Sequence, residues 1–185
     1  MKKIATALAV AAAALLSNAA MAQGYTGASF GSGHVNVECD DGLNCDNSGT
    51  AFKVLSGYQF GNGFAGELGY LSFGKAKASA PGVSLEVEAA GFLLAAAYHA
   101  EVARNFSLTA RVGLMSLKTE ISASVAGLGS ASDSETNTKP YFGIAATYAL
   151  TKAWKVELAA DFSRAEYEGE DASVRAVTAG ARFEF

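Results

Sequence analysis

Long apolar runs are absent from this sequence beyond its first residues. After residue 22, no apolar stretch approaches the roughly 20 residues that a transmembrane helix needs, so helical membrane spans are excluded. Basic residues are also in the minority, because 14 Lys and Arg stand against 18 Asp and Glu and give a formal net charge of −4. A nucleic-acid partner therefore has no electrostatic support.

Side chains suited to catalysis are equally scarce. His34 and His99 are the only histidines. An acyl-transfer or hydrolytic site needs a nucleophile beside a positioned base, but His34 borders a loop without a serine on the same face, and His99 falls at a short turn. The sequence also contains no phosphate-binding loop, zinc motif or calcium loop. We therefore expect neither an enzyme nor a cofactor or metal.

Cysteine occurs only twice, as Cys39 and Cys45 in "CDDGLNC". In an oxidising compartment we expect these two residues to form a local disulfide. Closing so small a loop stabilises the fold by about 2 kcal/mol in the chain-entropy description. The alternative, a metal site that adds His34, Asp40 and Asp41, lacks the ligand spacing of a tetrahedral centre.

The amino terminus has the features of an export signal. Lys2 and Lys3 precede an apolar run at 4–16, and the small-residue pattern Ala-Met-Ala follows at 20–22. A short apolar run with this cleavage pattern is typical of a secretory signal peptide rather than a membrane anchor. We therefore predict a signal peptide at 1–22 and a single exported domain at 23–185.

The remaining sequence has a hydrophobic period of two rather than 3.6, which indicates strands. In the last segment, for example, Val177, Ala179 and Ala181 alternate with Thr178, Gly180 and Arg182. Segments with this alternation are found at 25–33, 50–60, 64–73, 87–99, 106–118, 139–150, 154–165 and 177–185.

The connections between these segments sort by length. Short joins occur at 61–63, 101–105 and 151–153, and long polar ones at 34–49, 74–86, 119–138 and 166–172. A soluble β-sandwich would show the same alternation but has no reason to sort its loops in this way. Short turns at one end and long loops at the other are typical of outer-membrane barrels. We therefore predict an all-β fold, an eight-stranded antiparallel up-and-down transmembrane β-barrel in the bacterial outer membrane.

Aromatic residues on the apolar face support this prediction. They lie beside the short turns and the carboxyl terminus, where a girdle at one membrane interface is expected. The last strand carries the pattern through Phe183 to Phe185, which resembles the C-terminal signal read by the barrel-assembly machinery. The predicted girdle consists of Phe60, Phe64, Tyr98, Phe106, Tyr148, Leu150, Trp154, Phe183 and Phe185.

Three stretches resemble the transmembrane domain of the OmpA family: "YTGASFGSG", "VLSGYQFGNGFAGELGYLSFG" and "SLTARVGLMSL". The likeness extends over essentially all of 23–185, and "GYQFGNGFAGELGY" is its most specific part. It implies a barrel with a polar, plugged interior and surface loops; some small relatives are surface adhesins. The family's namesake continues into a peptidoglycan-binding domain that this sequence lacks, so we do not expect wall anchoring.

The alternation of inward and outward side chains along the strands places a balanced set of charges inside the barrel. The resemblance implies that Glu67 corresponds to a glutamate of that family's gating cluster, but Glu157 occupies the position of the partner arginine. Arg111 is our expected replacement partner for Glu67. The network either plugs the lumen or gates a narrow ion path. Its expected members are Lys53, Glu67, Arg111, Glu157, Asp161 and Arg182, together with Lys155 and Glu184.

The same alternation places three basic residues on the outer face, near the loop ends of their strands: Lys118, Arg164 and Arg175. There they either meet lipopolysaccharide phosphates or lie in water beyond the membrane. We expect a monomer that contacts outer-membrane lipids and lipopolysaccharide, stabilises the envelope and displays loops to a possible host or surface ligand. A small-conductance pore gated by the interior charges is the alternative.

Overall fold

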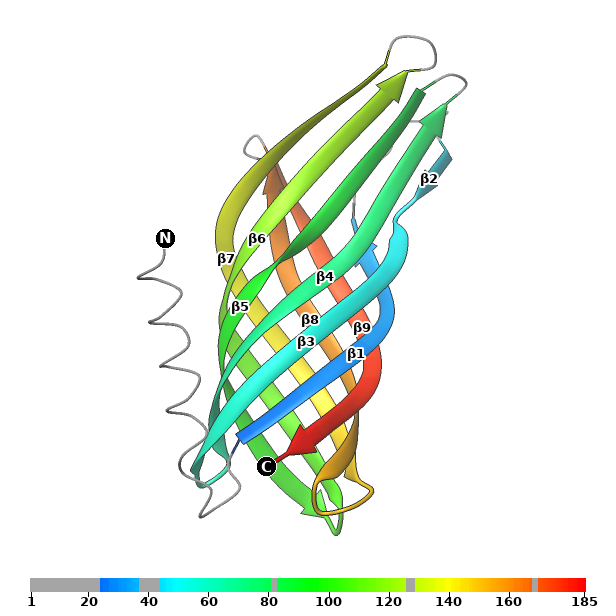
Figure 1. Cartoon of the computed structure of the whole chain (residues 1–185). Helices are drawn as coiled ribbons and strands as arrows, with labels where there is room; N and C mark the ends of the chain where they lie inside the picture. Colours follow the sequence, from blue (N-terminus) through cyan, green and yellow to red (C-terminus); the bar gives the residue numbers. More distant parts are fainter. Residues whose placement is uncertain (1–23, 37–43, 81–82, 126–128, 168–169) are drawn as a thin grey trace, which may run out of the picture.

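A computed structural model describes residues 24–36, 44–80, 83–125, 129–167 and 170–185. Within these ranges, no helix is long and apolar enough to cross a bilayer. The described residues form antiparallel strands arranged in a tilted ring (Figure 1). The strands are β1 Gly24–Val35, β2 Asn44–Asp46, β3 Ser48–Gly61, β4 Phe64–Ala80, β5 Val83–Ala103, β6 Phe106–Val125, β7 Gly129–Ala149, β8 Trp154–Tyr167 and β9 Glu170–Glu184.

The ring is closed by the contact between its first and last strands, β1 and β9. β1 pairs with both β3 and β9, and β4 pairs with both β3 and β5, so that each strand other than β2 has two neighbours within the ring. β2 lies outside the ring and pairs only with the outer end of β4, where Cys45 faces Ala78 across the ladder. The prediction of an eight-stranded up-and-down barrel is therefore confirmed, with β2 as an addition that the sequence did not indicate.

Side-chain alternation agrees with the predicted faces. On β5, Leu93, Ala95 and Ala97 are buried inside the barrel, whereas Phe92 and Leu94 are each 66% exposed on the outer wall. Exposed large hydrophobic residues on every strand of the ring are what a lipid-facing surface requires. Eight strands enclose an interior just wide enough for side chains, so the inward residues form the core.

The short turns are built by residues that accept a positive φ. Asn62 and Gly63 have φ of 52° and 83° and form a two-residue hairpin loop between β3 and β4, as Asn-Gly pairs favour. Asn105, with φ 66°, makes the corresponding turn between β5 and β6. Between β7 and β8, the Thr151 hydroxyl accepts a hydrogen bond of 2.9 Å from the Trp154 amide.

The opposite end of the barrel differs from the predicted long loops. Most of 74–86, 119–138 and 166–172 continues as paired strand, so that β5 has 21 residues, β6 has 20 and β7 has 21. A tilted strand spans the membrane with about 9–11 residues, and the rest of these strands extends beyond it. In Figure 1 this part of the sheet rises above β8 and β9.

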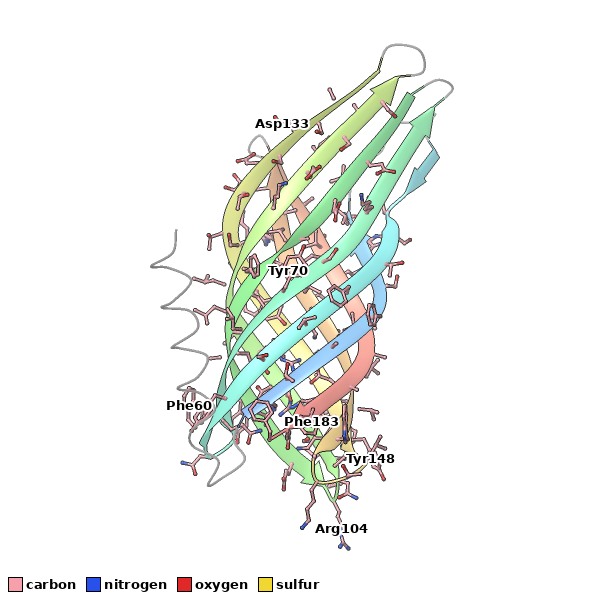
Figure 2. The ribbon with its side chains drawn as sticks, viewed as in Figure 1. Phe60, Tyr70, Arg104, Asp133, Tyr148 and Phe183 are labelled. Atoms are coloured by element: carbon pink, nitrogen blue, oxygen red, sulfur yellow. The ribbon has the colours of Figure 1, made fainter. Side chains whose placement is uncertain are left out.

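Aromatic rings mark both edges of the lipid-facing band. At the short-turn end, where Figure 2 shows Phe60, Tyr148 and Phe183, the Phe64 and Tyr98 rings lie 5.0 Å apart. A second girdle, which was not predicted from the sequence, lies at the other edge. It is built from cross-strand pairs on the same outward parity, and its members are Phe30, Phe52, Tyr70, Phe92, Phe142 and Phe162.

Candidate functional site

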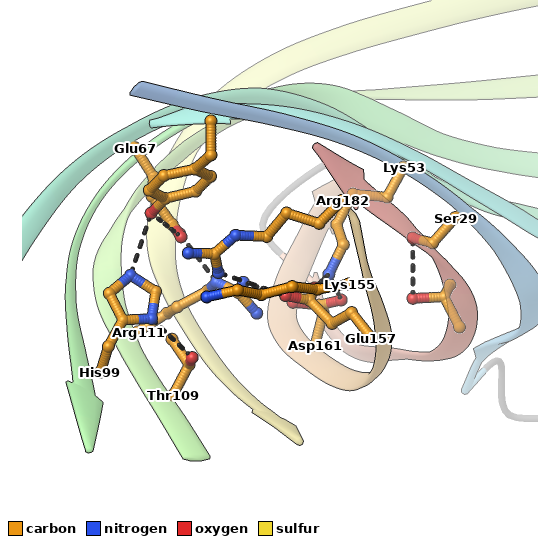
Figure 3. Close-up of polar contacts among 12 residues, drawn as sticks. Ser29, Lys53, Glu67, His99, Thr109, Arg111, Lys155, Glu157, Asp161 and Arg182 are labelled. Carbon is orange, nitrogen blue, oxygen red and sulfur yellow. Dashed lines mark hydrogen bonds and ion pairs between the residues drawn. The ribbon is translucent and has the colours of Figure 1, made fainter. Parts of the chain in front are cut away.

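The interior charges converge on Arg111, which β6 places on the inner wall (Figure 3). Its Nε lies 2.7 Å from Glu67 Oε2 and its Nη2 lies 2.9 Å from Glu157 Oε2. One guanidinium thus joins carboxylates from β4 and β8, strands that are not neighbours in the ring. Fork-shaped donors suit this bridging role because they hold two acceptors in a fixed plane.

A second buried pair lies beside this hub. Lys53 Nζ is 2.7 Å from Asp161 Oδ2 and 3.8 Å from Glu157 Oε1. The Tyr141 hydroxyl donates to the other oxygen of Asp161. Lys53 is 2% exposed and Asp161 is fully buried, so the pair is removed from water and these contacts replace its hydration.

Tyr25 connects the network to the short-turn end of the lumen. Its hydroxyl donates to Glu67 Oε1 at 2.6 Å and lies 3.1 Å from His99 Nε2, while the other ring nitrogen of His99 is 2.8 Å from the Thr109 hydroxyl. The Arg182 guanidinium stacks on the Tyr25 ring at 3.7 Å from its centroid. His99 is therefore an interior hydrogen-bonding residue in this structure.

Arg182 and its neighbours form the lowest layer of charge. Arg182 Nη2 lies 3.0 Å from Glu184 Oε1, and Lys155 Nζ lies 2.7 Å from the same oxygen. The Arg182 Nη1 to Glu157 Oε2 distance is 3.9 Å. This contact joins the lowest layer to the Arg111 hub, so the eight charged side chains predicted to lie inside form one continuous network.

Small residues opposite the large ones make room for this network. Gly57 pairs with Tyr25 across β1 and β3, and a Cβ atom at Gly57 would lie 2.3 Å from Tyr25 Cζ. Arg111 is flanked in register by Ala97 on β5 and Gly143 on β7. The sequence signal for this complementarity was the run of Gly and Ala at inward positions, but only the register shows which small residue faces which large one.

Packed side chains fill the lumen at a second level. On the extracellular side of the charges, Leu71, Phe73, Leu93, Met115 and Leu117 are each no more than 1% exposed. The cavity beside Lys53, Glu157 and Arg182 has a volume of about 10 Å³, which is about the space of one water molecule. The pore alternative is not favoured, because an ionic layer and an apolar layer both occupy the path.

The three basic rim residues differ in their surroundings. Lys118 Nζ lies 2.8 Å from Glu120 Oε2 beyond the apolar band of β6, and this hydrogen bond lowers the pKa of Glu120 and raises that of Lys118. Arg164 and Arg175 are exposed on the outer wall, and neither makes an ion pair with another described residue. Lys118 is thus paired with a carboxylate, whereas the guanidinium groups of Arg164 and Arg175 have no carboxylate partner among the described residues.

Several predicted features lie at or beyond the limits of the described residues. Cys39 and residues 1–22 are outside the described ranges, so the disulfide and the signal peptide stay predictions. At the end of β9, the rings of Phe183 and Phe185 lie 6.3 Å apart, and Phe183 also contacts Trp154 at 5.0 Å. Their role in assembly likewise stays a prediction.

Comparisons with known proteins agree with this geometry. Residues 19–176 match the family described as the OmpA-like transmembrane domain, whereas no curated protein matches the sequence. The solved structure of Ail from Yersinia pestis is similar with a TM-score of 0.60 at 13% identity, over 89% of this chain and 100% of that one. Neisserial surface protein A gives 0.59 at 15% identity over 88% and 97%, and OprG from Pseudomonas aeruginosa gives 0.55 at 12% over 89% and 97%.

Proposed function

Because the chain belongs to the OmpA-like transmembrane domain family and is a barrel of the bacterial outer membrane, we propose that it stabilises the envelope and displays its extracellular strands to external ligands. Because packed side chains fill the lumen, contacts with other molecules are expected on the outer surfaces of the barrel. The proposed role combines a rigid wall within the membrane with a protruding sheet that is accessible from outside.

The observation that carries the display role is an open edge on β7. Among the described residues, β7 pairs with β8 only between Phe142 and Ala149, whereas it pairs with β6 along its full length. Residues 129–141 therefore have a strand neighbour on one side only. An exposed strand edge presents backbone donors and acceptors on which an extended peptide segment can add as a further strand.

Pro140 explains where the open edge begins. The Ser163 hydroxyl donates to the Pro140 carbonyl at 2.9 Å, so the backbone of Pro140 faces β8. Proline has no amide hydrogen, and the ladder to β8 loses a donor at this position. Since both backbone polar groups of a strand residue point to the same side, residues 138, 136, 134 and 132 share this orientation.

A relative of this fold offers a precedent for surface recognition. The attachment invasion locus protein Ail has been solved in complex with the heparin analogue sucrose octasulfate, at 14% identity and a TM-score of 0.57 to this chain. Only the fold is shared at this identity. For the present chain, the proposed contact surface is the β7 edge rather than a transferred ligand site.

Backbone-directed variants test the display role. We would measure adhesion of cells that carry the protein to immobilised extracellular matrix, comparing Ser132→Pro with Ser132→Ala. Proline removes an edge amide without breaking the β6–β7 ladder, so adhesion is expected to fall, while alanine leaves it unchanged. Equal adhesion of Ser132→Pro and the native protein at equal surface level would refute display through this edge.

The structural role is tested separately by shortening the protruding hairpin. Removing residues 119–135 and joining Lys118 to Thr136, which face each other in register, through an Asn-Gly turn leaves the membrane-spanning barrel. We expect this variant to restore detergent resistance to cells that lack the protein. Failure of both the native and the shortened chain to restore resistance would contradict the envelope role.

A further inference from the structure

Arg164 and Arg175 form a basic pair on the outer wall where β8 and β9 meet. Arg175 faces Phe162 in register, and Arg164 faces Ser173, so the two arginines are diagonal neighbours on the same side of the ladder. Diagonal Cβ atoms on one face of a sheet lie about 7 Å apart, within reach of a common anion for two long side chains. Among the described residues, neither guanidinium has a carboxylate partner.

Among the side chains that the structure describes, no nearby charge neutralises this pair. Glu166, the next outward residue above Arg164 on β8, contacts Lys139 instead. On the other side, Arg175 faces His34 of β1. By contrast, Lys75 on β4 and Lys118 on β6 are already paired, as in the contact of 3.1 Å between Lys75 Nζ and Glu88 Oε2. Among the described residues, the rim arginines that have no carboxylate partner thus lie on β8 and β9.

An apolar groove on the outer wall reaches up to Val177, the outward residue next to Arg175 on β9. It has a volume of about 510 Å³ and extends from Val177 on β9 across β8, β7 and β6 to Tyr98 and Ala100 on β5. Alanines at 110, 146 and 160 leave its floor low, while Ile144, Leu158 and Val177 stand as its walls. On a surface otherwise covered by exposed aromatic and aliphatic side chains, this is a trough rather than a flat wall.

The register connects the groove to the arginines. Val177 is the next outward residue after Arg175 on β9, and it pairs with Ala160, which in turn pairs with Ile144 on β7. The cross-strand row therefore leads from the basic rim into the groove without an intervening polar residue. A molecule held at the arginines by an anionic group would place an attached apolar chain in this trough.

From this arrangement we propose that the outer wall over β6–β9 binds a phosphorylated glycolipid of the outer leaflet, with a phosphate held by Arg164 and Arg175 and an acyl chain seated over the three alanines. Guanidinium forks match phosphate oxygens in geometry and charge, and a chain in the groove gains dispersion contacts that a flat wall does not offer. The inference deepens the proposed envelope role by naming a lipid partner for the barrel wall.

Lipid retention by the purified, folded chain tests this site. The protein would be placed in phosphatidylcholine nanodiscs that contain bisphosphorylated lipid A, dephosphorylated lipid A or phosphatidylglycerol, and the bound lipid counted by native mass spectrometry. We expect preferential retention of bisphosphorylated lipid A. Equal retention of the dephosphorylated form, or equal retention of phosphatidylglycerol, would overturn the assignment to a glycolipid phosphate.

Variants separate the two halves of the site. Replacing both arginines by glutamine is expected to weaken retention roughly tenfold and abolish discrimination by phosphate, whereas Ala146→Phe weakens retention and preserves that discrimination. Lys118→Gln is the matched control, since its ammonium is already paired, and should leave retention unchanged. An equal loss in Lys118→Gln and the double variant would overturn the proposal. Heat-modifiable gel mobility confirms folding of each variant, and the adhesion assay reports the display role independently.

Discussion

Arg111→Met tests whether the interior network holds the barrel together. The substitution retains an unbranched chain of similar volume but removes the donors that contact Glu67 at 2.7 Å and Glu157 at 2.9 Å. Arg111 is 3% exposed and Glu67 is 1% exposed, so water cannot replace the lost contacts without opening the barrel. The variant therefore tests a buried ion pair rather than a surface contact.

The surrounding residues set the size of the expected loss. Glu157 keeps Lys53 at 3.8 Å and Arg182 at 3.9 Å, whereas Glu67 keeps only the neutral donor of Tyr25 among the contacts described. One carboxylate is thus stranded rather than two. Removing one partner of a buried pair costs about 3–5 kcal/mol, and we expect the free energy of unfolding to fall by this amount.

Urea unfolding of the barrel in lipid vesicles measures this loss. Trp154, the single tryptophan, lies at the membrane edge and reports unfolding by fluorescence. Arg104→Met, at an exposed turn position (Figure 2), is the control and should change the free energy by less than about 0.5 kcal/mol. Adding Glu67→Gln to Arg111→Met should recover part of the loss. A change below about 1 kcal/mol in Arg111→Met would refute the reasoning.

Further predictions concern the core, the lipid face and the loop. Gly57→Ala should reduce the free energy of unfolding by about 1–3 kcal/mol, because its Cβ would lie 2.3 Å from the rigid Tyr25 ring, and an unchanged urea midpoint would contradict this. Leu94→Arg places a cation on the lipid face and should lower the free energy of unfolding in vesicles by about 2–4 kcal/mol. A urea midpoint equal to that of the native chain would exclude a membrane contact at this position. Mass spectrometry of the exported chain without reductant should show a peptide containing Cys39 and Cys45 whose mass is lower by two hydrogen atoms than that of the reduced peptide. Detection of two free thiols would refute the disulfide.

The strand parity could be predicted because the period of two is a local property. Lys53, Glu67 and Arg111 occupy inward positions simply because apolar residues occupy the alternate ones, and no knowledge of the partner strand is needed. The Asn62-Gly63 turn was similarly evident from its residue types. The faces of the strands and the short-turn end of the barrel could therefore be predicted from local residue types.

Strand lengths beyond the membrane could not be predicted in the same way. Residues 119–138 are rich in Ser, Thr and Ala, which suit either a loop or a solvated ladder. Only the pairing between β6 and β7 shows that 119–125 and 129–138 are strand. The partners within the lumen also depend on register. Arg111 and Glu157 are separated by 46 residues and lie on strands that are not adjacent, so no local pattern links them.

Single-channel current across a planar bilayer tests the central claim, that the ionic and apolar layers plug the lumen, most directly. The refolded, heat-modifiable barrel is predicted to be silent. Arg111→Ala and Glu67→Ala, if they fold, report whether loss of a network member opens a path past Leu71 and Leu93, and the intact apolar layer predicts silence there too. Discrete openings in the native chain, with a size or frequency that shifts in these variants, would contradict the plug and make the charges a gate.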